Sequence, residues 1–284
     1  MANETTATTL AVLCQAIIAE ARITMSQGAS LRNYIMRRPL PAGKSGVTFP
    51  AYGAVSVAAV NEGTDLTNQA VSATAVTVSP AEYGGMTTLT DVADYTSNPT
   101  QVGTDIGRLF GEAIRAAQNQ AIWALFDGFT QTDGSSNADI SEAYIVSSVQ
   151  QMMSAMAPRP YYMAITPHVF EDLLTIYSTN TNNTADSIRN MVLTTGELPP
   201  IYGVIPILVD NLATGTSAGK ADAADAKCGI FSRNALGYVE GYDIRIETER
   251  NASLRAEEIV ATSYFGVGEI VDTWGVELLV DNKD

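Results

Sequence analysis

The sequence predicts a mixed α+β protein, and three observations carry this prediction. From Gly46 onward, apolar and polar residues alternate with a period of two, which is typical of a strand with one buried face. Asn98-Pro99 places a capping residue and a first-turn proline ahead of a long apolar stripe, which indicates a helix. Later strand and helix segments do not alternate regularly, so we expect an α+β arrangement and not a repeated βαβ one.

The composition excludes several classes of protein. The 284 residues include 16 Lys and Arg against 31 Asp and Glu, a formal charge of −15, so the counterion release that drives nonspecific DNA binding is not available. Hydrophobic residues make up 46% of the chain, which is enough for a buried core. The apolar run Leu10–Ala19 is shorter than the ~20 residues that cross a bilayer, and Glu4 stands where an export signal needs a cation. We therefore expect a soluble protein that is not exported.

Residues 1–45 are predicted to form a basic arm. An apolar helix is expected from about Thr8 to Thr24, followed by Gly28 and a segment from Leu31 to Lys44. The cations of this arm are Arg22, Arg32, Arg37, Arg38 and Lys44. Five cations less Glu4 and Glu20 give +3, which leaves −18 for the rest of the chain. This asymmetry indicates that the arm lies on an acidic surface, its own or a neighbour's, and the alternative is a solvated arm.

Residues 46–88 are predicted to form a long ribbon of two strands. The first strand runs from Val47 to Val60 and would span about 46 Å at roughly 3.3 Å per residue. Asn61-Glu62-Gly63 gives the turn, and a bulge is expected near Val76 on the return strand. An isolated apolar hairpin is marginal in water, so we expect a neighbouring subunit to cover it, with Phe49 and Tyr52 as contacts. The alternative is a hairpin folded back on its own domain.

The ribbon is also acidic. Between Gly46 and Gly107 there is no Lys or Arg, whereas Glu62 and Asp65 lie near the expected turn. The ribbon is therefore the predicted acidic complement of the basic arm.

The strongest helix signal runs from Pro99 to Gly128. About 29 residues would give a rod of ~43 Å at ~1.5 Å per residue. Gly103, Gly107 and Gly111 recur on one face of this helix, where each costs up to ~1 kcal/mol relative to Ala. The spacing predicts that another backbone approaches closely there, or that the helix bends.

The second half is predicted to mix helices and strands. Helices are expected at 141–156, 167–177 and 187–193, and strands at 161–165, 201–210, 228–232, 236–246, 258–265 and 276–280. Loops are expected at 178–185 and 213–226.

No reaction chemistry is predicted. Gly215-Thr216-Ser217-Ala218-Gly219 fits the nucleophile elbow of hydrolases, but that motif needs a later His, and the sole His168 comes earlier. Cys14 and Cys228 lack the spacing of a metal site, so they are expected to be buried small side chains. We expect no catalytic residue, no cofactor and no metal.

The order of these elements resembles the major capsid proteins of tailed bacteriophages, which have the Hong Kong 97 type of fold. The residues that carry the resemblance are Val47-Thr48-Phe49-Pro50, Asn61-Glu62-Gly63, Val76-Thr77-Val78-Ser79-Pro80, Leu89-Thr90-Asp91, Phe126-Asp127-Gly128, Ile165-Thr166-Pro167, Ile201-Tyr202-Gly203-Val204 and Tyr264-Phe265-Gly266-Val267-Gly268. Each segment alone is a weak signal of the resemblance, but their order and spacing cover nearly the whole chain.

The resemblance implies a domain plan and a function. The N-terminal arm would be residues 1–45 and the extended loop 46–88. The peripheral domain with its spine helix would be 89–135 and 237–265, and the axial domain 136–236 and 266–284. The protein would be a virion component that assembles in the host cytoplasm, through pentamers and hexamers, into an icosahedral shell around double-stranded DNA. Specific DNA binding and membrane contact are not implied.

Two departures from the family's pattern matter. Some members crosslink subunits through a loop Lys, but this ribbon has no Lys beyond Lys44, so we expect no covalent crosslinks. Some members begin with a scaffolding domain, whereas here the arm begins at once, which implies a separate scaffolding protein and leaves room for a cement protein. The alternatives are an encapsulin-like compartment shell, which shares the fold, and a surface-binding protein of a different class.

Overall fold

The computed structural model describes residues 17–25, 30–53, 55–57, 59–63, 65, 68, 70–92, 99–135, 138–179, 198–209 and 225–281. Its helices are α3 (Pro99–Trp123), α4 (Glu142–Ser154) and α5 (Pro167–Thr179), with short 3₁₀ turns η1 (Leu31–Asn33), η2 (Phe126–Gly128) and η3 (Asp272–Trp274), and residues 17–25 are also helical. Its strands are β1 (Met36–Pro39), β2 (Val47–Tyr52), β3 (Ala73–Val78), β4 (Ala81–Thr90), β5 (Thr132–Gly134), β6 (Tyr161–Ile165), β7 (Val204–Leu208), β8 (Asp225–Ser232), β9 (Leu236–Asn251), β10 (Ala256–Glu269) and β11 (Gly275–Asp281). The α+β class is confirmed.

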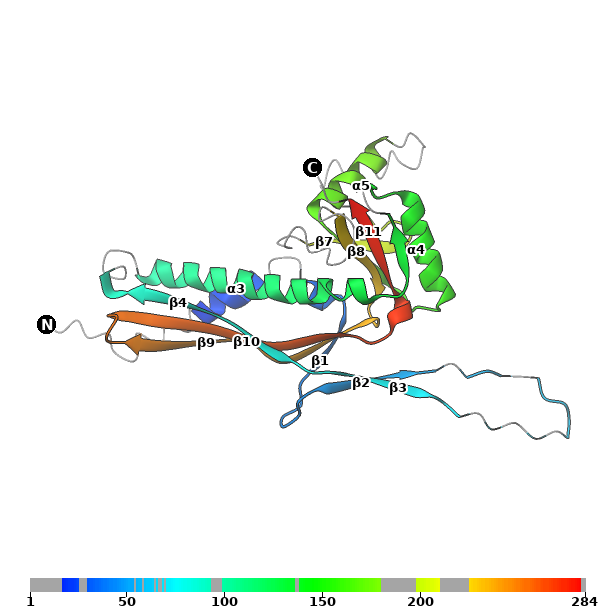
Figure 1. Ribbon diagram of the computed structural model, residues 1–284, viewed down its shortest axis with the longest axis horizontal. Coiled ribbons are helices and arrows are strands. Elements are labelled where there is room, and N and C mark those ends of the chain that lie inside the picture. Colours follow the sequence, from blue (N-terminus) through cyan, green and yellow to red (C-terminus); the bar gives the residue numbers. More distant parts are fainter. Residues whose placement is uncertain are drawn as a thin grey trace.

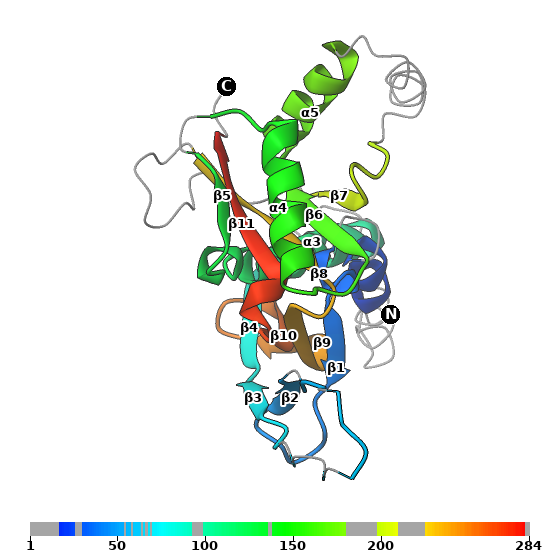
Figure 2. The ribbon, with the colours of Figure 1, turned by 90° about the vertical axis from the view of Figure 1, so that its right-hand side faces the viewer.

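The strands form two sheets and a separate ribbon. The four-stranded sheet has the order β1-β9-β10-β4, with α3 lying along it (Figure 1). The five-stranded sheet has the order β5-β11-β8-β6-β7, with α4 and α5 beside it (Figures 1 and 2). The ribbon pairs β2 with β3 and projects away from both sheets.

The main core lies in the half of the molecule that contains the five-stranded sheet. All eight residues of β8 are buried, because this strand lies between β11 and β6. Phe126 is fully buried and stacks on Phe231, with ring centroids 5.4 Å apart. Offset aromatic packing of this kind adds to the free energy gained by burying apolar area.

A second core joins the arm to α3 and the four-stranded sheet. A Cβ atom on Gly107 would lie 2.6 Å from the carbonyl oxygen of Ile17, and one on Gly111 would lie 2.5 Å from that of Ala21. Only glycine permits this approach, so the predicted close backbone contact is confirmed at these two positions. Ile17 and Ala21 are fully buried in a cluster with Ile114 and residues of β9 and β10.

Several element boundaries differ from the prediction. Helix α3 ends at Trp123, because the chain tightens there through a bond from the Leu125 N–H to the Ile122 carbonyl, and the η2 turn follows. The first ribbon strand ends at Tyr52, next to Gly53, and not at Val60. The register of β2 and β3 is continuous, so the bulge expected near Val76 is wrong. The register shifts lie instead between Thr262 and Phe265.

The loop predicted at 213–226 extends two residues too far, because β8 begins at Asp225. Asp225 and Ala226 are buried and belong to β8, where they pair with β11. The rest of that loop, together with the helix expected at 187–193 and residues 8–16 of the arm helix, lies outside the described residues.

Candidate subunit interface

The base of the ribbon is anchored on its own chain. Phe49 is 1% exposed and packs with Val78 and Val239 against the four-stranded sheet. Its ring also lies against the backbone of Gly237, where an added Cβ would be 3.1 Å from Cζ. Phe49 was expected to contact another subunit, but its side chain is already covered within the chain, because the face of β2 that bears it turns toward β9.

Beyond the base, the ribbon leaves apolar side chains uncovered. The pairing of β2 with β3 ends at Tyr52 and Ala73, and the Gly53 N–H then donates to the Ser72 carbonyl at 2.8 Å. Tyr52 is 72% exposed and Val57 is 95% exposed. Val55, Val60 and Val71 are also exposed. Such a surface on a slender ribbon marks an interaction site.

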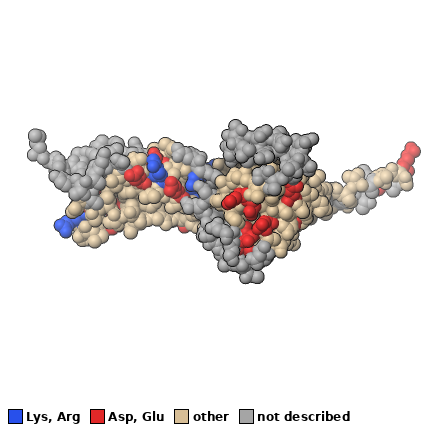
Figure 3. All heavy atoms as spheres, turned by 90° about the horizontal axis from the view of Figure 1, so that it is seen from above, with Lys and Arg blue, Asp and Glu red and all other residues tan. Residues whose placement is uncertain are grey.

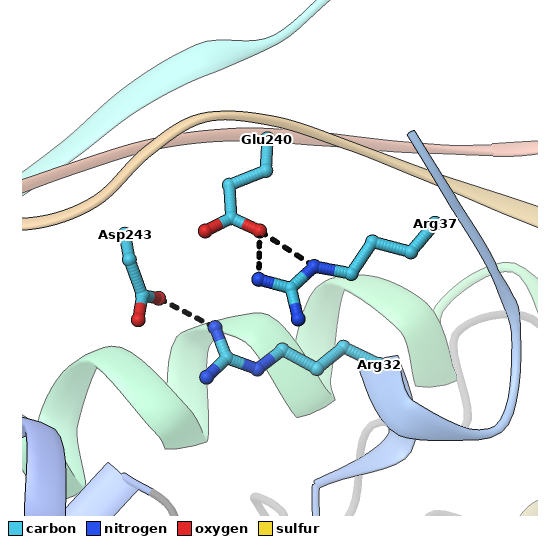
Figure 4. Close-up of polar contacts among 4 residues, drawn as sticks. All are labelled: Arg32, Arg37, Glu240 and Asp243. Atoms are coloured by element: carbon cyan, nitrogen blue, oxygen red, sulfur yellow. Dashed lines mark hydrogen bonds and ion pairs between the residues drawn. The ribbon is translucent and has the colours of Figure 1, made fainter. Parts of the chain in front are cut away.

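Arg32 of the arm is bound on its own chain (Figure 4). Its Nη1 donates to Asp243 Oδ1 at 2.5 Å, and the Arg32 side chain is 10% exposed. Burial lowers the pKa of this guanidinium, whereas the hydrogen bond and the charge of Asp243 raise it, and the net direction is upward. Arg32 therefore stays charged and is neutralised within its own subunit.

Arg37 is held nearby by Glu240 (Figure 4). Its Nε donates to Glu240 Oε2 at 2.6 Å, and its Nη2 donates to the same oxygen. The contact arises because β1 runs parallel to β9, with Arg37 opposite Tyr238 and Pro39 opposite Glu240. Arg37, Pro39, Glu240 and Gly241 line a cleft of about 450 Å³.

These two pairs show where two of the five arm cations bind within one chain. The arm cations Arg32 and Arg37 bind acids of β9 in their own chain and not the ribbon acids Glu62 and Asp65. Of the two surfaces that the charge asymmetry allowed for the arm, these residues use the chain's own. Neither Glu240 nor Asp243 stood out in the sequence, because a parallel pairing of residues 36–39 with residues 237–240 leaves no local signal.

The remaining predicted contact residues lie nearer the surface. Arg38 is half-buried, with its Cζ 4.9 Å from the centre of the Phe49 ring and its Nη1 3.4 Å from the Thr48 carbonyl oxygen. Arg22, Lys44, Glu62 and Asp65 are exposed. The end of the ribbon is acidic on the face drawn in Figure 3.

A pair of carboxyl groups marks the junction between the two sheets. Asp272 Oδ1 accepts from the Thr130 N–H at 2.7 Å, which ties the connection after β10 to the connection after η2. Glu269, at the end of β10, hydrogen-bonds to Asp272. Burial, together with the charge and hydrogen bond of Asp272, raises the pKa of Glu269 to about 7. Neither Glu269 nor Asp272 stood out in the sequence.

The reactive side chains that the sequence brought into question are Cys14, Cys228, His168 and Ser217. Within the described residues, no cluster of three or more His, Cys, Asp or Glu side chains could hold a metal ion. Cys228 is buried, and burial raises the pKa of its thiol to about 12, which keeps it protonated. His168 is half-buried at the start of α5, while Ser217 and Cys14 lie outside the described residues. No described helix is both long enough and apolar enough to span a bilayer.

The phage capsid protein family matches residues 72–276, which is more than half of the chain. The chain belongs to this family. No curated protein matches the sequence of the capsid protein. The family match does not favour a compartment shell or a surface-binding protein.

Solved capsids share the fold of this capsid protein. The capsid of Ralstonia phage GP4 superposes with a TM-score of 0.67 at 13% identity, covering 91% of this chain and 92% of that one. The capsid of cyanophage P-SCSP1u gives 0.65 at 16% identity, covering 90% and 89%. Mycobacterium phage Che8 gives 0.64 at 19% identity, covering 83% and 84%. The capsid protein is thus a structural protein with the Hong Kong 97-type fold.

Proposed function

We propose that this capsid protein is the major subunit of a tailed-phage head, and that it assembles through pentamers and hexamers into an icosahedral shell around double-stranded DNA. The observation that carries the proposal is the ribbon. Tyr52 and Val57 are largely exposed on a two-stranded element that has no core of its own, in a chain whose family forms capsids. Such a ribbon is covered only when copies of the chain come together.

The four regions expected from the sequence take separate roles in this proposal. The arm (1–45) and the extended loop (46–88) contact neighbouring subunits. The peripheral domain (89–135 and 237–265) contributes the spine helix α3, and the axial domain (136–236 and 266–284) lies at the centre of the capsomer. Sheet membership supports this division in outline, since β9 and β10 pair together whereas β11 pairs with β8. Strand β4, which crosses the boundary at residue 88, pairs with β10.

The proposed shell is noncovalent and noncatalytic. The extended loop contains no Lys, so no lysine of this loop can form an isopeptide bond to a neighbour. Cohesion then comes from buried area and charge pairs. A separate scaffolding protein directs assembly in the host cytoplasm, and a cement protein is an optional partner. The net charge of −15 suits a wall that confines DNA without binding it tightly.

Electron microscopy and sedimentation of the full-length protein, alone and with candidate scaffolding proteins, test this proposal. We expect closed regular shells or capsomer rings, which dissociate into monomer bands on a denaturing gel. A subunit that stays monomeric under every condition would refute shell formation, and ladders of crosslinked subunits would refute the noncovalent wall. Deletion of residues 1–45 should reduce assembly, and because it also removes β1 and the helix packed on Gly107 and Gly111, circular dichroism must show that the variant is folded. Normal shells from that variant would remove the arm from the interface.

A further inference from the structure

The acidic end of the ribbon has no cation within reach on its own ribbon. Glu62 and Asp65 are exposed, and the sequence from Gly46 to Gly107 contains no Lys or Arg. Neither carboxylate has an ion-pair partner within the described part of the chain. Red side chains mark this end in Figure 3, with no blue beside them. Two negative charges therefore project from the subunit without neutralisation.

The base of the same ribbon carries the opposite charge. Arg37 of β1, Arg38 of β1 and Lys44, in the turn between β1 and β2, lie on consecutive elements there. Glu240, which lines the cleft and accepts from Arg37, is the carboxylate counted against these cations. Three cations less this one carboxylate leave a local charge of +2, against the −2 of Glu62 and Asp65.

The basic groups keep donors available at the surface. Arg37 uses Nε and Nη2 on Glu240, and its side chain, which lines the cleft, is 44% exposed. The stacking of Arg38 on Phe49 holds its guanidinium in place at the foot of β2. Guanidinium groups fixed in this way bind carboxylates with little further loss of side-chain entropy.

We propose that the cleft between β1 and β9, together with Arg38 and Lys44, receives the acidic ribbon tip of a second copy of this chain. The tip of the same chain cannot reach this cleft, because β2 and β3 run away from β1 and carry the tip to the far end (Figure 1). The proposal rests on the proposed function, since it names the surface that the extended loop of one capsid subunit contacts on the next.

Charge reversal on each side, separately and together, tests the pairing. The tip variant is Glu62→Lys with Asp65→Lys, and the cleft variant is Arg38→Glu with Lys44→Glu. Arg37 is left unchanged, because its bond to Glu240 joins β1 to β9. The fraction of protein in shells is measured by sedimentation at 50 mM and 500 mM NaCl. Asp139→Lys with Glu171→Lys serves as the control for the tip variant, because it makes the same change in net charge at exposed positions outside the ribbon.

We expect each double variant to form about ten-fold fewer shells at 50 mM salt. We expect a smaller defect at 500 mM, because salt screens exposed charges. The quadruple variant should recover at least half of the wild-type yield, because its charges are complementary again. If it assembles no better than either double variant, or if only the cleft variant is impaired, the tip is not the occupant and the proposal is overturned.

Two further measurements keep the outcome clear. Circular dichroism of each variant establishes that the subunit is folded. The single substitution Lys44→Glu leaves Arg38 in place, so it does not disturb the packing of Arg38 on Phe49. We expect this single variant to lose shells by a smaller factor than the cleft variant, and wild-type yield from it would count against the proposal. Failure of the wild type to form shells would overturn the proposed function, whereas wild-type shells without rescue would overturn only this pairing.

Discussion

Strand β8 and the ribbon both carry apolar side chains but differ in what covers those side chains. Every residue of β8 is buried between two neighbouring strands, whereas Val57 of the ribbon is 95% exposed. An apolar pattern therefore identifies a surface that will be covered, but not the chain that covers it. In β8 the cover comes from the same subunit, and in the ribbon we propose that it comes from another. Substitutions in the two regions should separate these cases.

The largest effect on subunit stability is expected from Phe126→Ala. Phe126 is fully buried against Phe231 and Phe129, so its removal leaves a cavity in the main core. Substitutions of this kind cost about 3–5 kcal/mol of unfolding free energy, measured here by denaturant titration of unassembled subunits. Val57→Ala in the ribbon is the matched control and should change the unfolding free energy by less than about 0.5 kcal/mol. Equal effects at the two positions would contradict the comparison.

A smaller loss is expected from Gly111→Leu in α3. Its Cβ would lie 2.5 Å from the Ala21 carbonyl, so the arm helix must move away from α3, at a cost of about 1–3 kcal/mol for an overpacked site. Ala113→Leu, on the exposed face of the same helix, is the control. Hydrogen exchange should show faster exchange in residues 17–25 for the first variant only. Unchanged protection in both variants would mean that the glycine contact does not hold the arm.

The elements that the sequence predicted well are those with a local signal. Strand 161–165 has the predicted bounds, and α3 begins at Pro99, the predicted first-turn proline, because alternation and proline chemistry act over a few residues. A close backbone at Gly107 and Gly111 was one of the two outcomes that the repeated glycines predicted, but the sequence did not indicate that the arm supplies this backbone.

The features that the sequence did not reveal depend on pairing between distant segments. Strand β1 lies next to β9, about 200 positions further along the chain, and this parallel pairing decides that Arg37 binds Glu240. The burial of Phe49 within its own chain also depends on a distant segment, since Val239, which packs against it, comes from β9.

A pH-dependent effect is expected where the two sheets meet. Because folding raises the pKa of Glu269 to about 7, from about 4.5 when unfolded, the folded state binds the proton more tightly. The contribution of this group to stability is therefore fully present below pH 4.5, falls as the pH rises toward 7, and stays low above that. Asp272 is the charged group that faces Glu269 from η3, while Gly128 and Thr130 contribute neutral groups from the adjoining connection.

The variant Glu269→Gln should remove this part of the pH dependence. Calorimetry of unassembled subunits at several pH values between 5 and 8 would show a shallower change in melting temperature than in the wild type. The variant should also be more stable than the wild type at pH 8, because it replaces a partly buried negative charge beside Asp272 with a neutral group. Parallel curves for the two proteins would show that Glu269 ionises at its ordinary pKa.

The smallest effect on subunit stability, and the sharpest test of the comparison, is expected from Val57→Thr. The two side chains have nearly the same shape, and at 95% exposure neither is packed in the subunit, so the unfolding free energy should shift by less than about 0.5 kcal/mol.

Assembly should respond differently, because burying a hydroxyl costs more than burying a methyl group unless the hydroxyl finds a hydrogen-bond partner. The protein concentration at which shells form, measured by light scattering, should therefore rise. Val146→Thr on α4, which is 45% exposed, provides the matched change outside the ribbon. An unchanged threshold for Val57→Thr would mean that this side chain stays in water in the assembled shell, and that the ribbon's exposed apolar residues are not what a second subunit covers.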